Sequence, residues 1–325
     1  MPKGKIILST NNTDELHVIF GAGAVGMALM EALVAHEKKV RIVNHYSIQT
    51  MPDGVEHMRG DVASLDFARK AAEGATHVYD ALNAPYDQWP TLFPALQEGA
   101  VEAASTAGAK LIVLENLYMY GNTHGRPMTE ELPNAATTVK GKIRAQMSEE
   151  LLAVHRNGKV RVAIVRASDF IGPRALQGGL GDRVIYPALE GKSASIVGKP
   201  DMPHTYTYVP DVAHAMILLG ENNSALGQIW HVPNAETITS RQYIEQIFAT
   251  VGNPAKISAA PKPILWLMGI FDPIIREVYE MAYQFEQPFI VDHSKFVRAF
   301  GNIATPVKTV IPQTVDWYRA NPKHK

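Results

Sequence analysis

The sequence contains no cysteine in its 325 residues. This absence excludes disulfides, zinc–thiolate sites and thiol nucleophiles, and it fits a reducing compartment. An excess of charge of one sign is also missing, because 31 Lys and Arg balance 32 Asp and Glu. A formal net charge of −1 provides no attraction to nucleic acid or to an anionic membrane. We therefore expect a cytoplasmic protein that binds neither nucleic acid nor membrane.

Long apolar runs are absent too. The longest strongly apolar run, ILWLMGIF at 264–271, is too short to span a bilayer. The first residues, MPKGKIILSTNNTDEL, lack the extended apolar core of a secretory signal. The twelve histidines are scattered and form no H-E-x-x-H pattern, so no metal site is expected.

Short runs rich in Val and Ile alternate with segments of helical spacing. We expect strands over 16–20, 40–44, 77–82, 110–115 and 160–166, and helices over 24–37, 64–74, 91–108 and 142–158. Strands buried on both faces and separated by helices predict an α/β fold, with a doubly wound parallel sheet of the Rossmann type. The pattern loosens after about residue 170, where a smaller mixed substrate domain is expected.

The expected organisation has three parts. Residues 1–15 form an N-terminal extension, residues 16–173 a dinucleotide-binding domain, and residues 174–325 a substrate domain. Short segments within about 204–252, including a strand at 227–232 and a helix at 240–251, are expected to return to the first domain.

The strongest local signal is the G-x-G-x-x-G pattern of Gly21, Gly23 and Gly26, directly after a strand and at the start of a helix. The first glycine permits a tight turn, the second lets the backbone approach a pyrophosphate, and the third allows close helix–strand packing. The helix N-terminus, with Ala24 and Val25, offers N–H groups and a positive dipole end to phosphate. The pattern predicts dinucleotide binding; a purely structural glycine turn is the alternative.

The end of the second strand bears on which dinucleotide is bound. An NAD-preferring site usually places Asp or Glu there, but this sequence has Asn44, His45 and Ser47. These side chains offer hydrogen bonds to a 2′-phosphate, although the arginine that usually accompanies them is missing from the segment. NADP is therefore favoured, and NAD stays open.

Three further residues are candidates for cofactor contacts. Asp61 and Val62 follow the third strand, where a carboxylate and a backbone amide would meet the adenine. Capping of the next helix is the competing interpretation of Asp61. Asn83 follows the fourth strand in the same way.

Several longer segments resemble the extended short-chain dehydrogenase/reductase superfamily, and within it the NAD-dependent epimerase/dehydratase family. They are FGAGAVG, GDV (60–62), LIVLENLYMYG (111–121), VRASDFIGP (165–173) and HTYTYVPDVAHAM (204–216). The resemblance covers about residues 16–320 and implies a nicotinamide cofactor and a divided C-terminal substrate domain. It also implies a homodimer formed through the helices at about 91–108 and 142–157.

The family's chemistry uses a tyrosine, a lysine four residues later, and a serine or threonine after the fifth strand. By resemblance Lys142 is the lysine, which holds the nicotinamide ribose, whereas Thr138 replaces the tyrosine and Asn116 the Ser/Thr. A threonine hydroxyl is too weak an acid to replace a phenol. Asn116 retains an N–H donor for a carbonyl or developing alkoxide.

Nearby tyrosines suggest where the proton is handled instead. Tyr118 lies two residues beyond Asn116, and Tyr86 follows the fourth strand in a loop that borders the nicotinamide in the family. We therefore predict an NAD(P)-dependent oxidoreductase of the epimerase/dehydratase type, acting on a small carbonyl or alcohol, with Tyr118 or Tyr86 as the proton donor. A non-catalytic NADP(H)-binding sensor or interaction protein is the alternative, and a sugar-nucleotide epimerase/dehydratase is the second.

Residues at the expected strand ends and in the covering loop complete the predicted site. Ser168 is expected beside the nicotinamide, and the substrate candidates are Tyr86, Asp169, Phe170, Arg174, Met202 and Tyr206. The apolar segment 263–285 is expected to form an amphipathic helical pair over the pocket, although core packing explains its composition equally well.

Overall fold

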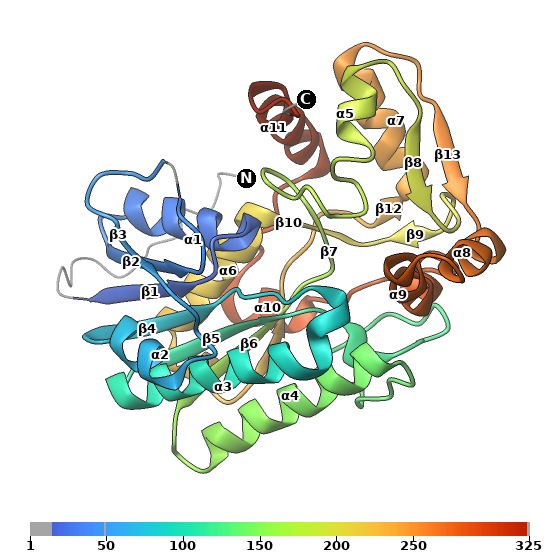
Figure 1. Cartoon of the computed structure of the whole chain (residues 1–325). Coiled ribbons are helices and arrows are strands. Elements are labelled where there is room, and N and C mark those ends of the chain that lie inside the picture. Colours follow the sequence, from blue (N-terminus) through green and yellow to red (C-terminus); the bar gives the residue numbers. More distant parts are fainter. Residues whose placement is uncertain (1–14, 49, 324–325) are drawn as a thin grey trace. The chain divides into compact units, whose positions relative to one another are not determined.

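The computed structural model describes residues 15–48 and 50–323. The extension expected over 1–15 lies outside this part except for Glu15. The chain divides into two units, and the elements of each are labelled in Figure 1. The first unit comprises the chain up to Glu115, Ile143–Arg166 and Val212–Trp230; the second comprises Asn116–Lys142, Ala167–Asp211 and the chain from His231 onward.

The first unit is built on a seven-stranded sheet with the order β11-β6-β5-β4-β1-β2-β3. The pairings from β3 to β6 are all parallel, which confirms the predicted Rossmann-type α/β class. The seventh strand, β11, adds to the outer edge of β6. The strands are β1 (Leu16–Phe20), β2 (Lys39–Asn44), β3 (Glu56–Arg59), β4 (Ala75–Asp80), β5 (Lys110–Glu115), β6 (Arg161–Arg166) and β11 (Ile229–His231).

Helices cover both faces of this sheet (Figure 1). Helices α1 (Ala24–Ala35) and α6 (Val209–Glu221) lie on one face, and α2 (Leu65–Ala71), α3 (Trp89–Ala107) and α4 (Val139–Arg156) lie on the other. A glycine brings α6 close to the sheet, and another brings α3 close to the loop before α2. A Cβ added to Gly220 of α6 would be 3.1 Å from the Tyr79 hydroxyl, and one added to Gly99 of α3 would be 1.9 Å from the Val62 carbonyl oxygen.

Element boundaries differ from the expected ones where a side chain bonds to the backbone. The strand expected over 77–82 ends at Asp80, because the Asp80 carboxylate accepts the Leu82 N–H at 3.0 Å and turns the chain. The helix expected over 142–158 starts earlier, at Val139. There the Thr138 hydroxyl accepts the Gly141 N–H at 3.1 Å, which is an N-cap.

The second unit contains three two-stranded sheets. They pair β7 (Asp169–Ile171) with β10 (Tyr206–Tyr208), β9 (Pro203–His204) with β12 (Ile238–Thr239), and β8 (Ala194–Val197) with β13 (Ile257–Ala260). Its helices are α5 (Ile185–Leu189), α7 (Ser240–Val251), α8 (Lys262–Gly269), α9 (Pro273–Met281), α10 (Ser294–Phe300) and α11 (Val307–Ala320). No helix in the part of the chain described is long and apolar enough to cross a membrane.

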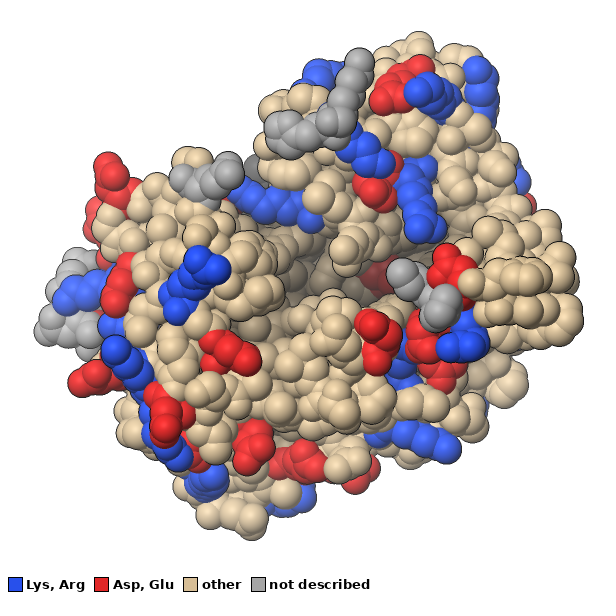
Figure 2. Space-filling model, in the orientation of Figure 1, with Lys and Arg blue, Asp and Glu red and all other residues tan. Residues whose placement is uncertain are grey.

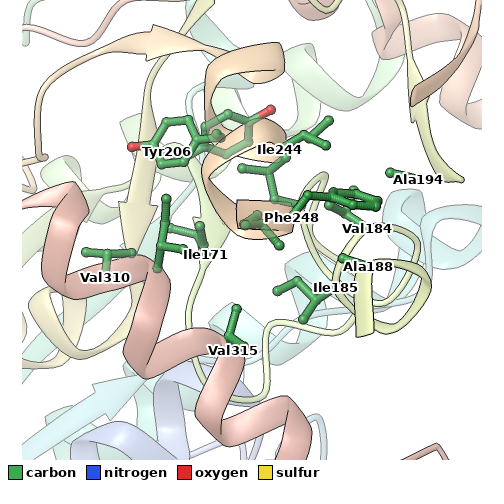
Figure 3. Close-up of a cluster of buried hydrophobic side chains, with 14 of the residues drawn as sticks. Ile171, Val184, Ile185, Ala188, Ala194, Tyr206, Ile244, Phe248, Val310 and Val315 are labelled. Carbon is green, nitrogen blue, oxygen red and sulfur yellow. The ribbon is translucent and has the colours of Figure 1, made fainter. Parts of the chain in front are cut away.

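The core of the second unit forms where α5, α7 and α11 meet. Figure 3 shows Ile185 of α5, Ile244 and Phe248 of α7 and Val315 of α11 in this cluster, and all four are at most 1% exposed. Helix α7 has the predicted bounds and starts with a capping box, in which Thr239 and Gln242 satisfy each other's backbone N–H groups. It belongs to the second unit, whereas α6 and β11 lie largely in the first.

A buried charge cluster joins the C-terminal ends of β5 and β6 in the first unit. Glu115 and Arg166 are register partners, and Arg166 Nε donates to Glu115 Oε2 at 3.0 Å. Arg144 of α4 lies on the other side, with its guanidinium 3.6 Å from Glu115 Oε1 and 4.7 Å from the centre of the Phe93 ring. The one carboxylate thus balances two buried guanidinium groups.

Replacing Glu115 by Gln is expected to lower the free energy of unfolding by about 3–5 kcal/mol, because two buried guanidinium groups lose their counter-charge. Urea unfolding of the variant measures this change. Glu150→Gln on the exposed side of α4 is the matched control and is expected to change stability by less than about 0.5 kcal/mol. Equal effects of the two substitutions would contradict the assigned role of Glu115.

Candidate functional site

The strand order of the first unit marks a place for a ligand. The chain winds from β1 outward to β2 and β3, then crosses to β4 on the other side of β1. In open parallel sheets, ligands bind outside the carboxyl ends of the strands at this reversal. The carboxyl ends of β1 and β4 are adjacent here, since Phe20 pairs with Asp80.

Two of the three fingerprint glycines, Gly21 and Gly26, have the predicted steric roles in the turn and in close packing. Gly21 has a φ of 100°, and a Cβ there would lie 2.7 Å from the Ala81 carbonyl oxygen. A Cβ on Gly26 would lie 1.9 Å from the Gly21 carbonyl oxygen, so only glycine lets α1 start this close to the turn. A Cβ on Gly23, in contrast, would meet nothing within 4 Å. Gly23 therefore borders open space that a bound group can enter.

The N-terminus of α1 is suited to an anion. Gly23 is the N-cap residue, no side chain caps the helix, and no acidic residue lies in its first turn. The first N–H groups of a helix have no partner within it, and the dipole end is positive there. Ala24 and Val25 open the helix, so their backbone amides lie at its N-terminus, where a pyrophosphate is predicted to bind.

The end of β2 contains a buried donor without a partner. Asn44 is 4% exposed, and its Oδ1 accepts the Tyr46 N–H at 3.2 Å. Its Nδ2 is buried and has no hydrogen-bond partner. A buried unsatisfied amide costs about 1–3 kcal/mol, so a ligand oxygen at this point would remove a penalty. His45 and Ser47, which follow, are exposed.

The segment after β2 contains no arginine, but the fold brings one from the neighbouring strand. Arg59 at the end of β3 pairs in register with Asn44, and its Nε donates to the His45 carbonyl oxygen at 3.2 Å. The Arg59 guanidinium is thus held beside the residues predicted to face the adenosine ribose.

Residues after β3 and β4 border the same end of the sheet. Asp61 accepts the Ala63 N–H at 2.9 Å, and α2 is instead preceded by Ser64, so the alternative interpretation of Asp61 as a helix cap is wrong. Val62 is buried and Asn83 is exposed. Asp80 was not predicted; its burial raises the pKa of the carboxyl group to about 6.

In the second unit the structure brings Asn116 and Tyr118 to the start of α4. Asn116 Oδ1 accepts the Tyr118 N–H at 3.1 Å, which starts the short 3-10 helix η2 (Tyr118–Tyr120) and leaves the NH2 of Asn116 as a donor. A Cβ on Gly141 would lie 2.6 Å from the Tyr118 carbonyl oxygen. Glycine at 141 therefore lets η2 contact the first turn of α4, one residue before Lys142.

The two lysines of this turn have different surroundings. Lys142 is exposed, whereas Lys140 is 2% exposed and pairs with Glu277 and Glu280 of α9. Thr138, which is predicted to replace the family's tyrosine, uses its hydroxyl to cap α4. Its oxygen is therefore engaged in a structural hydrogen bond.

A histidine–aspartate pair lies beside the second unit's predicted substrate residues. His204 is 2% exposed and donates from Nε2 to Asp169 Oδ2 at 2.7 Å. The His204 ring stacks on Phe285 and Phe289, with centroids 5.1 and 4.9 Å away. The Asp169 side chain is 23% exposed, so this carboxylate is the accessible member of the pair.

The remaining predicted residues divide into accessible and internal ones. Phe170, Met202, Arg174 and Tyr86 are half-buried. Ser168 is buried, and its hydroxyl donates to the Thr205 carbonyl oxygen at 2.6 Å.

Tyr206 lies inside the core of the second unit, so the structure gives it a packing role. It is 3% exposed, and its hydroxyl is 2.8 Å from Ser240 Oγ. The side chain on this strand therefore points away from solvent.

Gly141, Arg59, Asp80 and His204 were not predicted as site residues. A local signal existed for Gly141 alone, since a glycine one residue before the predicted lysine is unusual in a helix interior. The other three depend on contacts between segments that are distant in sequence.

The chain matches a known protein family and shares its fold with solved structures. A model of the NAD dependent epimerase/dehydratase family matches residues 18–232, which is more than half of the chain. No curated protein matches the chain.

Solved structures share the fold at low identity. The dTDP-glucose 4,6-dehydratase of Bacillus anthracis, in complex with NAD, has a TM-score of 0.79 at 15% identity, covering 94% of this chain and 97% of its own. The UDP-glucuronic acid 4-epimerase of Bacillus cereus, with NAD, has a TM-score of 0.75 at 17% identity, covering 95% of this chain and 100% of its own. The UDP-glucose 4-epimerase of Thermus thermophilus, with NAD, has a TM-score of 0.73 at 19% identity, covering 94% of this chain and 100% of its own.

Two alanine substitutions in the glycine turn are expected to separate binding from stability. Gly23→Ala places a methyl group in open space at an ordinary φ of −75°, so the melting temperature should hold while dinucleotide affinity falls about 10–100-fold. Gly26→Ala should instead lower the free energy of unfolding by about 3 kcal/mol, because its methyl group meets the Gly21 carbonyl. Titration calorimetry with NAD and NADP measures the affinity, and thermal melts measure the stability. Unchanged affinity in Gly23→Ala would contradict the assignment of Gly23 to the dinucleotide site.

Proposed function

Because the chain belongs to the NAD dependent epimerase/dehydratase family, we propose that it is an NADP(H)-dependent oxidoreductase that acts on a small carbonyl or alcohol compound. The observation that carries the proposal is the contact of Tyr118 with Gly141. It joins a phenol-bearing residue to the turn that presents Lys142. Thr138, at the position that the resemblance implies for the tyrosine, caps α4, so Tyr118, whose backbone carbonyl lies against this turn, is the proposed substitute.

The cofactor is held by the first unit in this proposal. The turn of Gly21, Gly23 and Gly26 and the open N-terminus of α1 bind the pyrophosphate. The unsatisfied Asn44 Nδ2 and the Arg59 guanidinium donate to the adenosine ribose and its 2′-phosphate. No carboxylate stands at Asn44 to repel that phosphate, which favours NADP over NAD.

Hydride transfer to or from the substrate carbon is the chemistry that a bound nicotinamide would supply. The NH2 group of Asn116 donates to the substrate oxygen and stabilises its developing negative charge. The Tyr118 hydroxyl delivers the proton to that oxygen in reduction and receives it in oxidation. The exposed Lys142 ammonium group binds the nicotinamide ribose. A positioned acid contributes about 10²–10⁴ in rate, and proximity contributes the larger part.

The second unit's residues favour a small substrate with an apolar part and a hydroxyl group. Phe170 and Met202 supply half-buried apolar surface, and the exposed edge of the Asp169 carboxylate accepts a hydrogen bond. Asp169 also disfavours a diphosphate at this position, because like charges repel. Arg174 is a further candidate for an anionic group of the substrate; its guanidinium lies 5.9 Å from the Trp317 ring.

Turnover of Tyr118→Phe and Lys142→Ala proteins tests the proposal. With a substrate found from a panel of carbonyls, alcohols and sugar nucleotides, each variant should lose about 10²–10⁴ in kcat/KM, measured by the absorbance of the reduced cofactor. Lys192→Ala, at an exposed site on a loop, is the matched control.

Three other results would contradict the proposal. Wild-type rates in both variants would remove Tyr118 and Lys142 from catalysis. Tight NADP(H) binding without turnover across the panel would support the non-catalytic sensor. Activity confined to sugar nucleotides would support the epimerase/dehydratase alternative.

The cofactor assignment predicts a selective effect at Arg59. Arg59→Ala should weaken NADP binding by about 10–100-fold, because a hydrogen bond to a charged group contributes about 1.5–3 kcal/mol. NAD lacks the 2′-phosphate, so its affinity should change little. Titration calorimetry with both dinucleotides measures the difference, with exposed Arg298→Ala of α10 as control. An equal loss for NAD and NADP would contradict a 2′-phosphate contact.

A further inference from the structure

Helix α8 and the turn after it expose an apolar surface in the second unit. We call this surface the α8 patch. Its side chains are 46–85% exposed, with Phe271 the most exposed; they are Ile264, Trp266, Leu267, Met268, Ile270 and Phe271. The segment was expected to pack over a pocket, but these six side chains face solvent. In Figure 2 the area at the place of α8 is correspondingly free of Lys, Arg, Asp and Glu colours.

The inner side of α8 is already packed. Leu265 is 5% exposed, and a Cβ on Gly269 would lie 3.1 Å from Arg276 Cα of α9. The α8 patch therefore occupies the broad outer side of the helix, and its exposure does not come from a helix detached from the unit. Residues 263–271 contain no charged side chain, which is unusual for an exposed helix.

The size of the α8 patch is close to that of a protein interface. With ordinary areas of about 150–250 Å² for large side chains, its exposed fractions amount to roughly 700 Å² of apolar surface. The largest apolar patch of a typical monomer is about 300–600 Å². A standard interface buries about 800 Å² on each partner.

Charges at the two ends of the α8 patch favour a second copy of the chain as its binding partner. Lys262 stands at the start of α8, and its Nζ lies 5.2 Å from the Tyr279 ring centre. Asp272 stands just past the end of the apolar segment. A surface that is basic at one end and acidic at the other complements itself when it is turned end for end. An anionic lipid surface would attract Lys262 but repel Asp272.

We propose that the α8 patch is a self-association site, where α8 pairs antiparallel with α8 of a second copy across a two-fold axis. Leu267, midway between Lys262 and Asp272, faces its own counterpart at the axis. Each Lys262 then lies near Asp272 of the partner subunit, and the positive N-terminus of each helix lies beside the negative C-terminus of the other. A two-fold interface of this kind uses the same patch on both copies.

This site is separate from the helices near 91–108 and 142–157 that the family resemblance implies for dimer formation. If both contacts form with two-fold axes that are perpendicular and intersect, the assembly is a tetramer, and if the α8 contact forms alone it is a dimer. Loss of the α8 contact therefore halves the mass of the assembly in either case. The inference does not depend on the proposed activity.

The absence of cysteine from the chain provides a direct test by single-cysteine cross-linking. Leu267→Cys is expected to form a disulfide-linked dimer under mild oxidation, because a residue on the axis meets itself within the 4.4–6.8 Å Cα separation that a disulfide needs. Leu176→Cys, 40% exposed elsewhere in the second unit, is the matched control and should stay monomeric on a non-reducing gel.

A mixture of Ile264→Cys and Ile270→Cys proteins tests the direction of pairing. Positions 264 and 270 are equally distant from 267, so the antiparallel arrangement predicts cross-links between the two variants and few within either. Preferential cross-linking of each variant to itself would overturn the antiparallel pairing. Equal cross-linking of Leu267→Cys and Leu176→Cys, or none at Leu267→Cys, would overturn the site.

Sedimentation velocity of the full chain tests the association without oxidation. The double variant Trp266→Asp, Phe271→Asp should halve the assembly mass relative to the wild type at about 10–100 μM, while Leu176→Asp should not. Thermal melting of the unlinked variant shows whether the unit remains folded. A wild-type mass equal to that of the double variant would overturn the proposal. Binding of wild type, but not the double variant, to phosphatidylserine–phosphatidylcholine vesicles as a monomer would assign the patch to lipid and overturn it too.

Discussion

The first unit depends on one close contact, the approach of Gly26 to the Gly21 carbonyl oxygen. A single methyl group at Gly26 would lie 1.9 Å from that oxygen, so only hydrogen on this side of the backbone permits α1 to begin immediately after β1. The same tight turn places the helix N-terminus at the point where the strand order reverses. Open space at Gly23 and an uncapped first turn of α1 both follow from it. The packing of α1 and the predicted anion site thus depend on the same turn.

A comparable contact organises the start of α4 in the second unit. Gly141 lets η2 approach, and Thr138, which is predicted to replace the family's tyrosine, caps the helix with its hydroxyl. The buried Lys140 fixes the turn further through Glu277 and Glu280. Lys142 remains exposed at the end of this rigid turn. The predicted lysine therefore follows a capped helix start that lies against the backbone of Tyr118.

The aromatic and charged residues of the second unit divide between packing and accessible roles. Tyr206 and the aromatic rings of α7 build the core, whereas Asp169 shows one edge beside the buried His204. The apolar residues of α8 follow neither pattern, since they are large and exposed. An exposed apolar surface is costly in water unless another surface covers it. This cost supports the proposed self-association through α8.

The sequence alone determined the alternation of strands and helices, the α/β class, the bounds of β1, β5 and α7, and the steric roles of the glycine fingerprint. These features depend on local spacing, burial periodicity and backbone freedom, which are visible in a short window of residues. Only the tertiary structure placed Arg59 beside His45 and Tyr118 against Gly141. It also paired His204 with Asp169 and exposed the apolar side chains of α8. Those positions were decided by contacts between segments distant along the chain, and no local pattern records which distant residue will be the neighbour.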